Sequence, residues 1–322
     1  MDGLKALAAI LACAAALAAF VPAPARAQEG AGVTGAVVLQ LPAGGRAAAL
    51  SGAYVGASGD ADALFYNPAG LHGIDAAASL SYQRHVSDIG AASLGGAYRL
   101  GRVVVGVGIA YLDAGEIAVV EPDPAYGGQT GIETGEHVGA SEIAARVAAA
   151  VPLLGDRLSV GAAAGLVSVS LAEARRAAPV FDLGAQYALP LVTIGASLRN
   201  FGPEMSGSGL ADAPLPTEAR LGAAFAWDRG DGWGGAVHAD LVAFVEESRT
   251  GLALGVEGGI LPGAAGSVSA VARAGFEAGG EDALGALRLG AGVGMGSFAF
   301  DYAYQDFDAF GAVHRVGLRW AR

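Results

Sequence analysis

The feature that most constrains this chain is a repeated alternation of apolar and small or polar residues. In the segment 191–200, the residues Val192, Ile194 and Leu198 alternate with Thr193, Gly195, Ser197 and Arg199. The segments 219–227, 268–276 and 287–295 alternate in the same way. A period of two indicates β-strands, and about nine to eleven residues is the length of a tilted strand that crosses a bilayer. Strands of a soluble sandwich are usually shorter and turn their apolar face inward.

The apolar residues of the chain do not gather into a membrane-spanning helix. Hydrophobic residues make up 53% of the sequence, yet no run after residue 27 is apolar over the roughly 18 residues that such a helix needs. Two classes remain, namely a soluble all-β protein with an apolar surface and a barrel that faces lipid. In lipid every backbone polar group needs an internal partner, so the strands of a membrane protein must form a closed barrel.

We therefore predict an all-β fold, a 14-stranded antiparallel transmembrane outer-membrane β-barrel with an N-terminal hatch or plug segment. The expected connections support this count, because the two longest, 114–137 and 202–215, both follow odd-numbered strands. Connections after even-numbered strands are short, as periplasmic turns are in bacterial barrels. Both termini are therefore predicted to lie in the periplasm. The expected strands are 76–87, 89–100, 102–113, 138–151, 157–171, 178–188, 191–201, 216–227, 233–245, 250–260, 264–276, 284–294, 296–305 and 311–320.

Residues 1–27 are predicted to be a signal peptide, so the chain is expected to be exported. Together with the predicted barrel, this places the protein in the bacterial outer membrane. Lys5 precedes the apolar stretch Ala6–Val21, and Ala25-Arg26-Ala27 forms a small-residue cleavage signal. The mature chain would then start at Gln28. An uncleaved anchor and a lipoprotein acylated at Cys13 are the alternatives, but the cleavage signal and the continued apolar stretch favour a signal peptide.

Composition excludes several functions. The single cysteine leaves with the signal peptide, so disulfides and thiolate chemistry are excluded. Removing Asp2, Lys5 and Arg26 from the 19 basic and 31 acidic residues leaves 17 and 30, a net charge of −13. A chain of this charge is a poor partner for nucleic acid.

Sequence motifs give no sign of catalysis. The chain has no G-x-S-x-G, H-E-x-x-H or P-loop motif, and its five histidines lie far apart. We expect no enzyme activity, no catalytic residue, no metal site and no cofactor. For the acidic connection 114–137, the sequence leaves two interpretations open: weak calcium binding, or a loop that is simply solvated.

A set of charged residues falls on the inward face of the predicted strands. Such charges are expected either to pair and hold the wall and plug rigid, which we favour, or to bind a ligand. Counting by period two places these residues in the lumen: Arg199, Arg220, Arg273, Arg288, Asp301 and Arg315, together with Asp182, Asp240 and Glu257.

The segment 28–75 precedes the predicted barrel of residues 76–322. Within it, Gly44–Leu71 combines a small-residue helix, an acidic turn, an aromatic pair and a proline element that redirects the chain. We predict that it packs inside the barrel near the periplasmic mouth, where its aspartates meet lumenal arginines. The alternative is a periplasmic tether. The residues of this predicted hatch motif are Arg46, Asp60, Asp62, Phe65, Tyr66, Asn67, Pro68 and Gly70.

This N-terminal pattern, with His314-Arg315 before the last apolar residues, resembles the PorV/PorQ family of outer-membrane proteins. That family is related in architecture to FadL-type transporters, which carry a similar Asn-Pro-Ala-Gly element. The resemblance implies an accessory in protein secretion or surface attachment, with secretion-system or exported proteins as partners. The FadL relation implies instead a passive channel for hydrophobic small molecules, gated by the hatch. Outer-membrane lipid is a partner in both cases, and the sequence leaves both open.

Overall fold

The computed structural model describes residues 34–84, 89–127, 129–230, 232–261, 268–279, 286–307 and 311–322. The predicted signal peptide 1–27 and residues 28–33 of the predicted hatch lie outside these ranges. The described residues form fifteen strands: β1 (Ala76–Arg84), β2 (Gly90–Leu100), β3 (Val103–Pro122), β4 (Gly131–Leu153), β5 (Leu158–Leu171), β6 (Ala174–Ala188), β7 (Val192–Phe201), β8 (Ser206–Ser208), β9 (Glu218–Asp228), β10 (Trp233–Phe244), β11 (Arg249–Ile260), β12 (Val268–Ala278), β13 (Leu287–Met295), β14 (Phe298–Asp306) and β15 (Ala312–Ala321).

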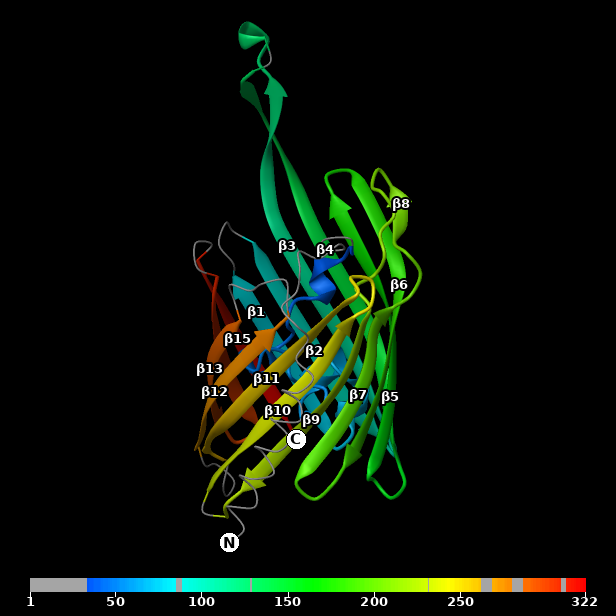
Figure 1. Ribbon diagram of the computed structural model, residues 1–322, viewed down its shortest axis with the longest axis vertical. Helices are drawn as coiled ribbons and strands as arrows, with labels where there is room; N and C mark the ends of the chain where they lie inside the picture. Colours follow the sequence, from blue (N-terminus) through cyan, green and yellow to red (C-terminus); the bar gives the residue numbers. More distant parts are fainter. Residues whose placement is uncertain are drawn as a thin grey trace.

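Fourteen of these strands close into an antiparallel barrel (Figure 1). Neighbours in the chain pair with one another, β7 pairs with β9, and β1 pairs with β15 to close the ring, with Leu80 opposite Leu318. The short strand β8 is outside the ring, where it adds to the end of β6. The predicted 14-stranded all-β barrel is therefore confirmed.

The alternation along each strand separates an apolar outer face from a lumen of charged and small residues. On β13, for example, Leu289 is 47% exposed and Val293 is 52% exposed. The neighbouring residues Arg288 and Gly290 face the lumen, where Arg288 pairs with Glu277 and Gly290 lies against Ala49. A barrel with a large apolar outer face and a polar interior is built to contact lipid.

No helix among the described residues is long and apolar enough to cross a membrane.

The prediction of a long connection at 114–137 is wrong, because most of these residues belong to strands β3 and β4. β3 and β4 continue past the barrel as a hairpin around the 3-10 turn η5 (Pro124–Tyr126), and this hairpin projects beyond the other strands (Figure 1). The register shifts between Asp113 and Glu116 and between Ala118 and Val120. Such bulges break the period of two, so the alternation disappears although pairing continues. Among the described residues no group of acidic or histidine side chains is placed to hold a metal ion.

Residues 34–75, called here the hatch, fill the middle of the barrel (Figure 1). The hatch contains four short helical elements: η1 (Val37–Leu39), α2 (Gly45–Ala49), η2 (Ala61–Phe65) and η3 (Pro68–Leu71). Its side chains form most of the largest buried apolar cluster, and Leu50, Tyr54 and Leu64 are fully buried. α2 contacts β12 to β15, whereas η3 contacts β3 to β6, so the hatch bridges opposite parts of the wall.

Candidate functional site: a hatch between two chambers

Small residues let the hatch approach the wall closely. A Cβ placed on Gly195 of β7 would lie 2.2 Å from the carbonyl oxygen of Val55. A Cβ on Gly290 would lie 2.4 Å from the Cβ of Ala49 in the hatch. The inward glycines of the wall are therefore explained by close backbone approach, a usual reason for glycine within a strand.

The Asn-Pro-Ala-Gly element joins the hatch to the wall. Asn67 Oδ1 accepts a hydrogen bond from the backbone N–H of Ala69 at 3.1 Å, and Pro68 occupies the first helical position of η3. Asn67 Nδ2 donates to the carbonyl oxygens of Val55 at 2.8 Å and Ala185 at 3.1 Å. Asn67 therefore caps η3 and also fixes it to another hatch segment and to β6. Gly70 is needed nearby, since a Cβ there would lie 2.7 Å from the Ala57 carbonyl oxygen.

One side of the hatch contacts the wall through a closed ring of alternating charges, called here the charge ring. Each carboxylate in it contacts two guanidinium groups, and each guanidinium contacts two carboxylates. Two members belong to the hatch and four to β11, β12, β14 and β15. The ring runs Arg46–Asp60 (3.0 Å), Asp60–Arg319 (3.3 Å), Arg319–Asp301 (2.5 Å), Asp301–Arg273 (2.8 Å), Arg273–Glu257 (2.9 Å) and back to Arg46 (2.5 Å).

The charge ring is electrically neutral and mostly buried, although the side chains of Arg46 and Arg319 are 17% and 18% exposed. Asp301 is 0% exposed and Asp60 is 2% exposed. The Tyr54 hydroxyl donates to Asp60 at 2.5 Å, which adds a third bond to that carboxylate. Because every charge in the ring has two opposite neighbours, removing any member leaves buried charges without full compensation.

On the opposite side, side chains of the wall bind the backbone of the hatch. Asp240 of β10 accepts hydrogen bonds from the N–H groups of Tyr54 at 2.8 Å and Val55 at 3.0 Å. Wall side chains also donate to hatch carbonyl oxygens: Arg199 to Phe65 at 2.8 Å, Arg220 to Gly52 at 3.0 Å, and Gln186 to Val55 and Ala57 at 2.9 Å. We call Gln186, Arg199, Arg220 and Asp240 the backbone-binding group.

Glu218 orients the two arginines of this group. It pairs with Arg199 at 3.1 Å and with Arg220 at 2.9 Å. The guanidinium of Arg199 also lies 5.3 Å from the centre of the Tyr66 ring, and the guanidinium of Arg146 lies 5.9 Å from the centre of the Phe65 ring. The predicted aromatic pair therefore faces lumenal arginines.

The structure places the predicted site residues in three separate settings. Arg46, Asp60, Arg273 and Asp301 meet in the charge ring, whereas Arg199 and Arg220 belong to the backbone-binding group. Arg288 and Arg315 lie on neighbouring parts of the wall outside both, where Arg288 pairs with Glu277 at 2.9 Å.

Asp62 differs from the expectation, because it forms no ion pair with any described residue. Its Oδ2 atom is buried without a hydrogen-bond partner. Burial, with the nearby Asp60 carboxylate, raises the pKa of Asp62 from 3.8 to about 7.

Arg319, Glu218 and Gln186 were not among the predicted residues, although each is central to a contact. Arg319 follows Arg315 and Gly317 at a period of two on β15, so the alternation alone places it in the lumen. Glu218 lies at the first residue of β9, where strand ends are hard to locate.

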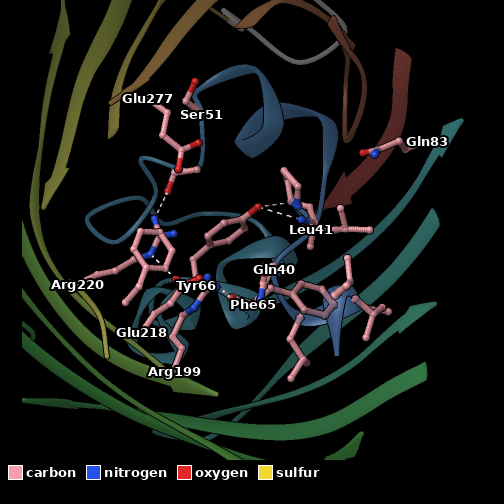
Figure 2. Close-up of a pocket in the computed structure, with 18 of the residues that line it drawn as sticks. Gln40, Leu41, Ser51, Phe65, Tyr66, Gln83, Arg199, Glu218, Arg220 and Glu277 are labelled. Carbon is pink, nitrogen blue, oxygen red and sulfur yellow. Dashed lines mark hydrogen bonds and ion pairs between the residues drawn. The ribbon is translucent and has the colours of Figure 1, made fainter. Parts of the chain in front are cut away.

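The hatch separates two chambers in the lumen. The outer chamber, at the end with the β3–β4 hairpin, has a volume of ≈ 300 Å³. Figure 2 shows Tyr66 at its centre, with Arg199, Glu218 and Arg220 on one side and Leu41 on the other. Tyr66 hydroxyl contacts the backbone of Ala43 at 2.9 Å. The inner chamber, at the end where β1 begins, has a volume of ≈ 770 Å³ and is lined by all six residues of the charge ring.

No protein-family model matches the sequence, and no curated protein sequence matches it either. Solved structures do match over nearly their whole length. The toluene transporter TbuX of Ralstonia pickettii is 14% identical with a TM-score of 0.57, over 86% of this chain and 98% of that one. The CymD monoaromatic hydrocarbon channel is 12% identical with a TM-score of 0.61, over 87% and 97%. A FadL homologue of Pseudomonas aeruginosa is 11% identical with a TM-score of 0.53, over 87% and 98%.

At these identities the likeness establishes the fold, which is that of a FadL-like fourteen-stranded barrel with an N-terminal segment. Membership of the PorV/PorQ family stays a prediction.

Proposed function

We propose that the protein is an outer-membrane channel for small hydrophobic molecules, with the hatch as its gate and both termini in the periplasm. The observation that carries this proposal is the position of the hatch between two chambers. An open pore would have no such division, and a purely structural plug would have no need of a chamber on each side. In this proposal residues 1–27 are the signal peptide, 28–75 are the N-terminal segment that contains the hatch, and 76–322 are the barrel.

The residues that line the outer chamber support the proposal that the substrate is apolar. Phe65, Phe244 and Phe307 line it together with Leu41 of the hatch, beside the arginines of the backbone-binding group. Pockets for small molecules commonly combine apolar walls with a few placed polar groups. The similar structures include a toluene transporter and a monoaromatic hydrocarbon channel, which is consistent with such a substrate.

Movement of the hatch is the step that this proposal requires, and a disulfide can test it. A Cβ on Gly95 of β2 would lie 3.4 Å from the Cβ of Ala61 in η2, close to the roughly 3.5–4.5 Å found in disulfides. The double variant Ala61→Cys/Gly95→Cys, purified and placed in liposomes, should take up toluene when reduced and lose uptake when oxidised.

Each single cysteine variant is the control, because it carries the same local substitution and forms no intramolecular bond. Both should transport equally with and without oxidant. Unchanged toluene uptake by the fully oxidised double variant would rule out the hatch as a gate.

A second function, in protein secretion or surface attachment of the PorV/PorQ type, is favoured by the β3–β4 hairpin. Its tip exposes apolar side chains, with Val120 56% exposed, Tyr126 67% exposed and Ile132 49% exposed. Beyond Asp113 no strand of the described residues pairs with the hairpin on the β2 side, so its edge can accept a partner's strand. Shortening the hairpin to a tight turn after Asp113 should stop surface display of an exported protein and leave toluene uptake unchanged if this second function holds.

A further inference from the structure

Arg315 of β15 is a buried cation whose hydrogen-bond partners are all neutral. It is 3% exposed, and its Nη1 donates to Ser81 Oγ at 3.2 Å while Nη2 donates to Gln83 Oε1. Among the residues that the structure describes, its Nε–H has no acceptor and no carboxylate lies within ion-pair distance. The lumenal arginines of the charge ring and the backbone-binding group all pair with carboxylates. A buried cation without a carboxylate in direct contact is costly, so Arg315 is the exception that needs an explanation. The Asp62 carboxyl acts on it only at longer range.

A second arginine has an unpaired donor beside the same space. Arg288 of β13 pairs through Nη2 with Glu277, but its buried Nε–H has no acceptor. The strand register explains why the two meet. β14 lies between β13 and β15. On β14, Ala303 is opposite Arg315, and Gln305, two residues further along, is opposite Arg288. The small side chain of Ala303 leaves space between the two larger ones.

That space is a recess of ≈ 10 Å³ lined by Arg288, Arg315, Ala303 and Gln83 of the wall and by Pro42 and Ala48 of the hatch. Its size is that of about one water molecule or one atom of a larger group. Pro42, Gln83 and Arg288 also line the outer chamber. The recess therefore lies at the side of that chamber.

We propose that Arg288 and Arg315 form a binding site for a monovalent anion, either a halide or the carboxylate of a molecule in the outer chamber. One anionic atom in the recess would accept hydrogen bonds from both unpaired Nε–H groups. Charge-assisted bonds of this kind are roughly twice as strong as neutral ones. The anion would also supply the counter-charge in direct contact that Arg315 lacks. The site does not depend on transport, so it stands or falls separately from the proposed channel function.

Calorimetric titration of the full-length protein in detergent tests the site. The buffer is HEPES without halide or carboxylate, and the probes are sodium bromide, sodium benzoate and neutral benzamide. We expect one bromide or one benzoate per barrel, with affinity at least tenfold weaker in Arg315→Gln and also weaker in Arg288→Gln. The control is Arg175→Gln, an exposed β6 residue whose Nε donates to Ser168, which should bind like the wild type.

The probes distinguish the two sources of the anion. Bromide that binds and competes with benzoate would identify a halide site that a carboxylate can also occupy. Benzoate binding without bromide binding would identify the carboxylate of a chamber ligand. Benzamide affinity should not differ between wild type and Arg315→Gln in either case.

Two results would overturn the proposal: no binding of either anion by the wild type, or equal affinity in wild type and both variants. Migration before and after heating shows whether each variant is folded. If Arg315→Gln does not fold, Arg288→Gln decides the question, since that side chain is 12% exposed and less central to the packing.

Discussion

The two sides of the lumen hold the hatch by different chemistry. On the β11–β15 side, wall charges contact charged hatch side chains, Arg46 and Asp60, in a closed ring. On the β6–β10 side, wall side chains contact the hatch backbone, as Asp240 does at Tyr54 and Val55. The first side depends on the identity of particular hatch residues. The second depends on the path of the hatch chain, because every residue except proline offers the same N–H and C=O groups.

This difference suggests a division of roles for a moving hatch. Breaking the charge ring separates charges in a buried place, so it should set the main barrier to release. The backbone bonds are individually weaker and can be replaced by water one at a time. The four predictions below test this comparison, from the largest expected effect to the smallest.

Asp301→Ala should have the largest effect, because it leaves the buried Arg273 and the partly buried Arg319 without one of their two carboxylates. Removing one partner of a buried ion pair costs about 3–5 kcal/mol. Urea unfolding in lipid vesicles should show a loss of this size. Glu173→Ala, at an exposed turn, is the control and should be close to neutral. A loss below about 1 kcal/mol for Asp301→Ala, the value of a surface pair, would mean that the ring does not act as a buried network of charges.

Gly195→Ala should come next, since its Cβ would lie 2.2 Å from the Val55 carbonyl oxygen. Overpacking of this kind costs about 1–3 kcal/mol, and the strain should move the hatch away from β7. The measurement is leakage of toluene through the barrel in liposomes, which should rise. Gly96→Ala is the matched control, because its Cβ would meet its nearest atom, on Val107, at 3.6 Å. Equal leakage in both variants would show that close approach at β7 is unimportant.

Asp240→Asn should weaken the backbone contacts by about 1–2 kcal/mol, the difference between a charged and a neutral acceptor. Both hatch N–H groups donate to the same oxygen, Oδ2 of Asp240, so the amide oxygen of asparagine can still accept from both, but as a neutral acceptor. Hydrogen exchange should therefore speed up at Tyr54 and Val55, with little change at Arg46 and Asp60. Faster exchange throughout the hatch would instead indicate that the two sides release together.

Asp62→Asn should have the smallest effect at low pH, where the docked carboxyl is already protonated, and should appear as a change in pH dependence. Burial raises the pKa of Asp62 to about 7 from 3.8, so the docked hatch retains a proton that a released hatch loses. Docking is then favoured at low pH and weakens as the pH rises from about 4 to 7. Toluene leakage should increase over that range in the wild type and stay flat in Asp62→Asn. Leakage that falls with rising pH would contradict the assignment.

Much of the barrel could be predicted from the sequence, because strand pairing repeats a local pattern. The period of two placed Leu289 outside and Arg288 inside, and it could equally have placed Arg319. The pattern failed where pairing continued through bulges, as between Asp113 and Glu116 of the β3–β4 hairpin. A bulge adds one residue to a strand, so the alternation is lost although the strand is not.

The sequence by itself determined the strands, their outward face and the presence of a compact segment before them. Only the tertiary structure decided which charges meet. Arg46 and Glu257 are separated by 211 residues, and Asp60 and Arg319 by 259. Their pairing depends on the closure of the barrel and on where the hatch lies within it. The same holds for Asp62 and Arg315, two charges that the alternation and the acidic turn suggested would be paired. Whether a buried charge finds its partner is set by a few ångströms of packing, which no local pattern records.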